Sequence, residues 1–146
     1  MSSAGFLLDA LDEQGLAPDD ITEFLFTHAP PDHLWGLMDY FADLLFKNAT
    51  YMIGRTEWDY WTDPNTVDAI DDARTTFAVG AARRLARIED RIVFFKDGNE
   101  VMQNIAARAT FGHTQGHTAF EVRDGNNAIV LGPMADKGRI VTIFLN

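Results

Sequence analysis

The sequence predicts an α/β fold formed by a single domain that spans residues 1–146. Short apolar runs with strand character alternate with segments whose apolar residues recur at helical spacing. Hydrophobic residues make up 47% of the chain, which is typical of a globular protein. No internal repeat interrupts this pattern. A compact domain of this length buries about 70% of its unfolded surface, so one hydrophobic core is expected.

A helix followed by a strand is expected at the start of the chain. Apolar residues recur at helical spacing over residues 4–16, and Gly15 followed by Pro18 ends that pattern. The run at 21–27, ITEFLFT, is apolar, favours a strand, and ends directly at His28. The strand therefore delivers the first histidine of the chain.

The next segment is predicted to be helical and then extended. After two consecutive prolines, residues 33–46 can resume a helix, and this interpretation packs Met38, Phe41 and Leu45 in the core. The sequence TYMIG at 50–54 predicts a short strand.

The second half of the sequence predicts two helices and a set of strands. A brief helix is expected at 56–61, and a long amphipathic helix is expected from residue 65 to about residue 90. Four arginines gather toward the carboxyl end of the long helix and are predicted to form a solvated face: Arg83, Arg84, Arg87 and Arg91. Strands are predicted at 92–96, 105–111, 118–124 and 127–132, with a hairpin turn at Asp124–Asn127.

The composition limits the partners and the location that we expect. A formal net charge of −10 opposes binding to phosphate backbones, so a nucleic acid scaffold is disfavoured as a partner. No apolar stretch approaches the roughly 18 residues that span a bilayer, and no signal peptide is recognisable, so we expect a cytoplasmic chain without a membrane partner. The chain has no cysteine, which leaves nitrogen and oxygen ligands for any metal.

All four histidines lie in two loop motifs, each directly after an apolar run. THAPPDH contributes His28, Asp32 and His33, and GHTQGHT contributes His113 and His117. Imidazole and carboxylate donors suit Zn²⁺, with Mn²⁺ or Fe²⁺ as alternatives. We therefore predict a metal site with His28, Asp32, His33 and His113 as ligands. His117 is predicted to contact these ligands without binding the metal itself.

A purely structural interpretation of the motifs stays open. The histidines of THAPPDH can cap a turn, while Asp32 serves as the N-cap of the helix that follows. In GHTQGHT, one of the two histidines can simply buttress its loop. Neither alternative requires a metal.

The two motifs together resemble signatures of a known family. THAPPDH and GHTQGHT are similar to the THxHxDH and PGHTPGHT signatures of metallo-β-lactamase fold hydrolases, and the resemblance extends over about 5–132. The stretch NATYMIGRTEWDYWTDP is most similar to the methyl parathion hydrolase and acyl-homoserine lactone lactonase branch. The resemblance implies an αββα sandwich and a dinuclear site, with His28 and His113 on one metal and Asp32 and His33 on the other.

The sequence also departs from that family. Pro30 stands where the signature has its middle histidine, and Gly132-Pro133 stands where a bridging aspartate is expected. The family has further strands before this region and a further αβ half after it. We therefore expect a truncated sandwich that is completed by oligomerisation, as a homodimer or a higher homo-oligomer.

The resemblance and the motifs together predict a zinc-dependent hydrolase acting on small-molecule esters. The primary expectation is a promiscuous phosphodiesterase or phosphotriesterase that uses a metal-activated hydroxide. In this scheme Asp32 is a ligand or the base that orients the water. The alternatives are a lactone or carboxyl ester hydrolase, and a catalytically silent, oligomerising relic.

Further side chains near the motifs have roles that the sequence leaves open. Trp58, Tyr60 and Trp61 form a dense aromatic group, for which packing in the core or an interface is favoured over a substrate wall. Glu57 and Asp136 are acidic residues that would replace a lost metal ligand if either lay at the site.

Overall fold

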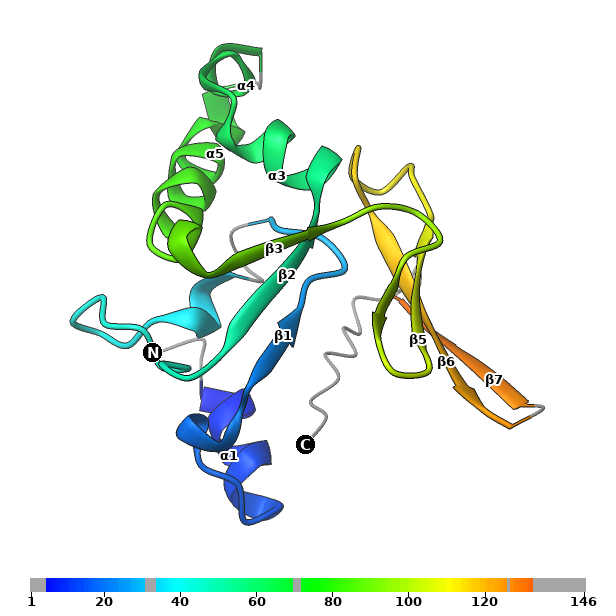
Figure 1. Cartoon of the computed structure of the whole chain (residues 1–146). Coiled ribbons are helices and arrows are strands. Elements are labelled where there is room, and N and C mark those ends of the chain that lie inside the picture. Colours follow the sequence, from blue (N-terminus) through cyan, green and yellow to red (C-terminus); the bar gives the residue numbers. More distant parts are fainter. Residues whose placement is uncertain (1–4, 31–33, 70–71, 126, 133–146) are drawn as a thin grey trace.

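The computed structural model describes residues 5–30, 34–69, 72–125 and 127–132. Over these residues the chain forms two sheets of three and four strands, with helices packed on the first sheet (Figure 1). Asp32, His33, Pro133, Asp136 and the run IVTIFL at 140–145, whose alternating apolar residues predict a strand, lie outside the described residues.

The first sheet is parallel and contains β1 (Glu23–Leu25), β2 (Thr50–Gly54) and β3 (Ile92–Phe95), in that order. Its strands confirm the three runs predicted in these regions, although β1 is shorter than its apolar run. Parallel neighbours need a long crossover connection. Between β2 and β3 this connection contains α3 (Arg55–Thr62), α4 (Pro64–Ala69) and α5 (Asp72–Leu85).

The second sheet is antiparallel, and its strands follow one another in chain order. They are β4 (Glu100–Met102), β5 (Ile105–Ala109), β6 (Thr118–Asp124) and β7 (Asn127–Leu131). The predicted hairpin between β6 and β7 is confirmed, because Asp124 pairs with Asn127 and Gly125 takes a φ of +57°. The strand β4 was not predicted, since its three residues are too few to show a period.

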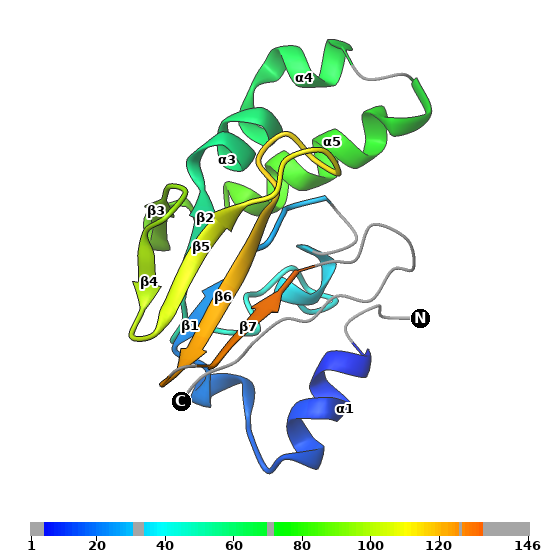
Figure 2. The ribbon, with the colours of Figure 1, turned by 90° about the vertical axis from the view of Figure 1, so that its right-hand side faces the viewer.

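The two sheets pack face to face, and helices cover the outer face of the first sheet. Leu25 and Phe95 of the first sheet contact Ile105, Ala107 and Phe120 of the second in one buried cluster. Figure 2 shows β5 and β6 lying in front of β1 and β2, with β7 beside β6. Burial of a side chain the size of Phe120 contributes about 2 to 3 kcal/mol, so this cluster holds the two sheets together.

A larger buried cluster joins the helices to the first sheet. Phe24 and Tyr51 pack in it with Trp58, Trp61 and Leu85, which come from α3 and α5. Trp58 and Trp61 are 8% and 9% exposed, which confirms the packing interpretation for these two aromatic residues. The cluster fixes α3 against β2, and α3 carries a residue of the candidate site.

The amino-terminal helix is confirmed, although its bounds are narrower than predicted. It forms α1 (Gly5–Glu13), and Gly15 takes a φ of +71° directly after it. A short 3₁₀ helix follows at Pro18–Asp20. None of the described helices is long and apolar enough to cross a membrane.

The helix predicted at 33–46 is wrong. Among the described residues of this segment, the helical part ends with a 3₁₀ turn at Trp35–Leu37, and Met38 then pairs with Leu44 in an isolated bridge. The carboxylate of Asp39 accepts hydrogen bonds from the backbone N–H groups of Phe41 and Asp43, at 2.8 and 2.9 Å. These local bonds compete with helical ones and favour a turn.

The core positions predicted in this segment are correct only in part. Phe41 at the tip of the turn is 81% exposed, so its predicted burial is wrong. Met38 and Leu45 are half-buried and pack against the large cluster. The long helix predicted from residue 65 is also wrong, because α4 and α5 are separate helices and α5 ends at Leu85.

Candidate functional site

The two histidine motifs meet where β1 ends and β6 begins. The backbone N–H of Thr118 donates to the carbonyl of Thr27 at 2.8 Å, which ties the first residue of β6 to the residue before His28. The GHTQGHT loop precedes β6 and follows β5. Sheet pairing and sheet packing therefore bring together two loops that are far apart in the sequence.

Three imidazole rings gather at this junction. The ring centroids of His28 and His113 lie 4.9 Å apart, those of His28 and His117 lie 5.1 Å apart, and those of His113 and His117 lie 5.7 Å apart. His28 and His117 are buried, while His113 is exposed. The cluster therefore has one solvent-facing imidazole and two buried ones.

The two other predicted ligands, Asp32 and His33, lie outside the described residues. Among the residues that are described, no group of three or more His, Asp or Glu side chains is arranged to hold a metal ion. The structure thus brings His28 and His113 together, and the ligand roles of all four predicted residues stay a prediction.

Thr27 and Thr110 orient the two buried rings, Thr27 through its hydroxyl and Thr110 through both its hydroxyl and its backbone carbonyl. Nδ1 of His28 lies 2.9 Å from Oγ1 of Thr27, and Nδ1 of His117 lies 3.0 Å from the carbonyl oxygen of Thr110. A carbonyl only accepts, so Nδ1 of His117 carries the proton and Nε2 has a free lone pair. Within the described structure, this buried Nε2 has no hydrogen-bond partner.

Burial lowers the pKa of His117 below its usual range, partly offset by the hydrogen bond to Thr110. The nearby His113 lowers this pKa further, and Glu57 opposes that effect. The His117 ring is therefore neutral at pH 7, because a cationic imidazole is disfavoured in this buried environment.

The carboxylate of Glu57 connects both loops to α3. This residue is 1% exposed and lies in the first turn of the helix. Its Oε1 accepts hydrogen bonds from the backbone N–H of Ala29 at 2.9 Å and from Nε1 of Trp61 at 2.7 Å. Its Oε2 accepts from Oγ1 of Thr114 at 2.7 Å and from the backbone N–H of Gly116 at 3.0 Å. One buried side chain thus contacts three separate segments.

Sequence reasoning singled out Glu57 as a possible substitute ligand and missed this connecting position. The sequence signal was an acidic residue in the first turn of a short helix directly after a buried strand. Its contacts with the two loops depend on how the sheets pack, which no local pattern reveals. Asp136, the other acidic candidate, lies outside the described residues.

The loop sits directly on the first turn of α3 at Gly116. A Cβ atom at this position would lie 2.2 Å from the backbone nitrogen of Glu57 and 2.5 Å from its Cα. Real Cβ atoms do not approach so closely, so only glycine fits here. Gly116 also lines a cavity of about 200 Å³, together with Arg55, Lys96 and Phe111.

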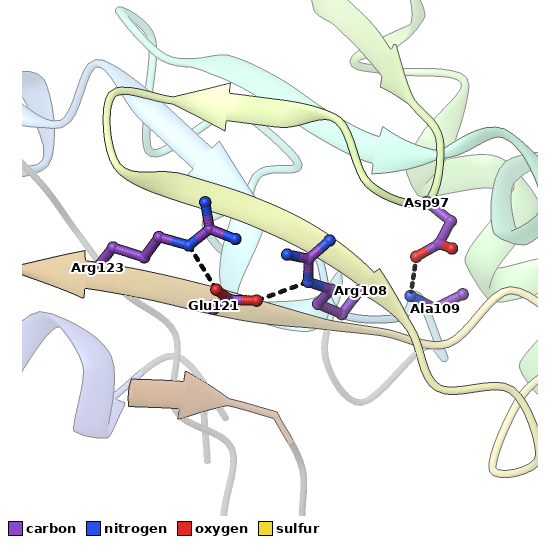
Figure 3. A network of polar contacts seen from close by, with 5 residues as sticks. All are labelled: Asp97, Arg108, Ala109, Glu121 and Arg123. Carbon is purple, nitrogen blue, oxygen red and sulfur yellow. Dashed lines mark hydrogen bonds and ion pairs between the residues drawn. The ribbon is translucent and has the colours of Figure 1, made fainter. Parts of the chain in front are cut away.

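A second polar network lies on the antiparallel sheet, and Figure 3 shows it from close by. Glu121 accepts hydrogen bonds from Nε of Arg108 at 2.6 Å and from Nε of Arg123, and these bonds hold the pKa of Glu121 below its usual range. The backbone N–H of Ala109 donates to Asp97. Both arginines are engaged with a carboxylate, so this network favours structural pairing over anion binding.

No protein-family model and no curated protein sequence matches the chain, whereas solved structures do. The chain is similar to AidC, a dizinc quorum-quenching lactonase, with 27% sequence identity and a TM-score of 0.77, over 87% of this chain and 46% of that one. It is also similar to the hydrolase AbOPH of the beta-lactamase superfamily, with 26% identity and a TM-score of 0.75, over 87% and 45% of the two chains.

A third structure is similar in fold alone. A quorum-quenching N-acyl homoserine lactone lactonase matches with 18% identity and a TM-score of 0.56, over 86% of this chain and 44% of that one. The present chain thus spans less than half the length of each of these three structures.

Proposed function

Because this chain is a member of the metallo-β-lactamase superfamily by its fold, as its motifs predicted, we propose that it is a metal-dependent hydrolase of ester bonds. One observation carries the proposal: the rings of His28 and His113, from distant motifs, lie 4.9 Å apart at the end of β1. A structural role for either motif alone does not require this meeting.

The spacing of the rings fits imidazoles around one ion. A zinc–nitrogen bond of about 2.0–2.1 Å, plus roughly 1.1 Å from nitrogen to ring centre, places two tetrahedral ligands about 5.2 Å apart between ring centres. The 4.9 Å between the ring centroids of His28 and His113, the two proposed ligands that the structure describes, is close to this value. The buried Nε2 of His117, which lacks a hydrogen-bond partner, is a second sign that a polar group belongs here.

We assign His28, Asp32, His33 and His113 to hold the ion, with zinc favoured and manganese or iron as alternatives. A metal ion held by these residues would supply Lewis-acid chemistry toward the substrate oxygen and would lower the pKa of a water molecule to about 7. Asp32 either completes the ligand set or acts as the base that orients the water.

The chain's own residues orient the site and limit its access to solvent. Thr27 and Thr110 contact Nδ1 of His28 and His117, and these contacts leave the Nε2 side of each ring facing away from its threonine. Burial of His28 and His117 excludes water from these two rings, while His113 is exposed to solvent. His117 supports the His28 ring across an edge-to-face contact.

For the substrate we propose activated phosphodiesters or phosphotriesters, with lactones as the second candidate. The similarity of the stretch NATYMIGRTEWDYWTDP to the methyl parathion hydrolase and acyl-homoserine lactone lactonase branch supports the phosphoester proposal. The similarity to AidC, a lactonase, supports the lactone candidate to an equal degree. A catalytically silent relic is the outcome that remains if no ester is hydrolysed.

The experiment measures bound metal and hydrolysis of p-nitrophenyl phosphodiesters and of an acyl-homoserine lactone, before and after chelation. We expect at least one ester to be hydrolysed and chelation to abolish turnover. His113→Ala and His33→Ala should lose metal and activity, whereas Gln115→Ala, an exposed neighbour in the same loop as His113, should retain both. Turnover that survives both histidine substitutions would contradict the site assignment.

We further propose that the chain self-associates through β7. This strand is the outer member of the described antiparallel sheet, and its residues Ile129 and Val130 are each 64% exposed. An apolar strand at a sheet edge favours pairing with another copy. The mass in solution, from light scattering, tests this proposal.

A further inference from the structure

We propose that Glu57 is a positioning residue that fixes both histidine loops on α3 and supplies the negative charge that favours a cation at the histidine cluster. This inference rests on the proposed function, because it assigns a role in binding the same metal. It concerns a residue that touches no histidine ring and that acts through the loops that carry the rings.

Glu57 accepts hydrogen bonds from both loops that carry the histidines. Three of the four groups that donate to Glu57 belong to direct sequence neighbours of the three histidines: Ala29 follows His28, Thr114 follows His113 and Gly116 precedes His117. The fourth donor, Nε1 of Trp61, holds the carboxylate on its own helix. Displacement of this one side chain would therefore loosen all three imidazoles at once.

Glu57 is an acidic side chain that is almost fully buried. The backbone N–H groups of Ala29 and Gly116 and the indole N–H of Trp61 can only donate, so these three hydrogen bonds stabilise negative charge on the oxygens of Glu57. None of the ion pairs among the described residues includes Glu57. A buried charge without an ionic partner is costly, and a divalent cation among the nearby imidazoles would offset that cost.

The hydrogen bonds to Glu57 exclude this side chain as a direct ligand of the metal. A carboxylate offers about four acceptor positions, and two donors already occupy each oxygen of Glu57. To bind a metal directly, the side chain would have to release the loops that bring the histidines together. Glu57 therefore acts on the ion through position and charge.

The test compares Glu57→Gln with two matched variants. Glu121→Gln removes another partly buried carboxylate, which lies on β6 and pairs with arginines. Trp61→Phe removes one donor to Glu57 but keeps the charge and both loop contacts. Zinc affinity is measured by calorimetry, and Co²⁺ absorption reports the ligand geometry, on variants whose circular dichroism shows a folded chain.

We expect Glu57→Gln to weaken zinc binding by about tenfold or more and to change the Co²⁺ spectrum. Glu121→Gln and Trp61→Phe should stay within about threefold of the wild type, because both keep the buried charge and the loop contacts. Equal losses in Glu57→Gln and Trp61→Phe, or an unchanged affinity in Glu57→Gln, would overturn the proposal. If Glu57→Gln does not fold, Thr114→Val replaces it, because this change removes a tether from a half-buried loop residue.

A measurement without metal separates this inference from the proposed function. Hydrogen exchange of the Ala29 and Gly116 amides, which donate to Glu57, should be slow in the wild type and fast in Glu57→Gln, while β6 amides stay protected. Unchanged exchange overturns the positioning role. A wild type that binds no zinc overturns the proposed function and the role of the charge, and the exchange result still decides whether Glu57 fixes the loops.

Discussion

Replacement of Gly116 by alanine should destabilise the chain more than most single substitutions. The new Cβ would lie 2.2 Å from the backbone nitrogen of Glu57 and 2.6 Å from its Cβ, and the backbone of α3 cannot yield as a flexible side chain would. The GHTQGHT loop would therefore have to move away from α3. That movement breaks the hydrogen bonds from Thr114 and Gly116 to the Glu57 carboxylate.

The size of the effect follows from these contacts. Overpacking costs roughly 1 to 3 kcal/mol. Each lost hydrogen bond to a charged group costs roughly 1.5 to 3 kcal/mol. The loop relieves the clash by moving away, which breaks the two hydrogen bonds, so the overpacking cost and the hydrogen-bond cost do not add in full. We expect the free energy of unfolding to decrease by about 4 kcal/mol. A domain has roughly 5 to 15 kcal/mol of stability in total, so the variant should be marginal.

Urea denaturation followed by tryptophan fluorescence measures the free energy of unfolding. Gly80→Ala is the matched control, because Gly80 lies inside α5 and a Cβ there meets only a flexible arginine side chain, at 3.4 Å. This control should match or exceed the wild type by up to about 1 kcal/mol, since alanine favours a helix. A loss of less than about 1 kcal/mol in Gly116→Ala would refute the close seating of the loop on α3.

Three further predictions concern pH and assembly. Burial lowers the pKa of His117, so the His117 ring binds a proton more tightly in the unfolded chain than in the folded chain. The urea midpoint should therefore fall as pH drops below about 6.5, and His117→Gln should reduce this fall. Burial raises the pKa of Tyr51 to about 12, so the free energy of unfolding should decrease as pH rises from about 10 toward that value. The decrease should follow the absorbance of tyrosinate, and Tyr51→Phe should remove it. Ile129→Lys should convert a dimer to a monomer in light scattering, and an unchanged mass would exclude β7 from the interface.

Local sequence patterns predicted most strands because each of these strands contains a short run of apolar or β-branched residues. The runs that became β2, β3 and β6 bury side chains on sheet faces, so hydrophobic content alone identified them. The hairpin turn was recognisable from Gly125, whose positive φ suits a type of turn that few residues tolerate. The strand β4 was not predicted because three residues are too few to show a period.

The failure at 33–46 has a different cause. This segment contains apolar residues at helical spacing, and the same spacing led to the predicted burial of Phe41. Asp39 changes the outcome, because its carboxylate binds two backbone N–H groups that a helix would need. A side chain that bonds its own backbone outweighs a hydrophobic pattern when little core surface is gained.

The candidate site was predictable from the sequence only as far as its imidazoles. Histidine is uncommon, so the placement of all four histidines of the chain in two motifs indicates a shared role. The rings of His28 and His113 do lie close together, with centroids 4.9 Å apart. Glu57 gave no comparable signal, since a glutamate in a first helical turn is ordinary. What sets it apart is the packing of the antiparallel sheet against the parallel one, which brings the loop before β6 onto the helix after β2. A residue whose partners are backbone groups of distant loops leaves no periodicity and no motif. The histidines that we propose as metal ligands are therefore easier to infer from a sequence than the buried carboxylate that contacts their loops.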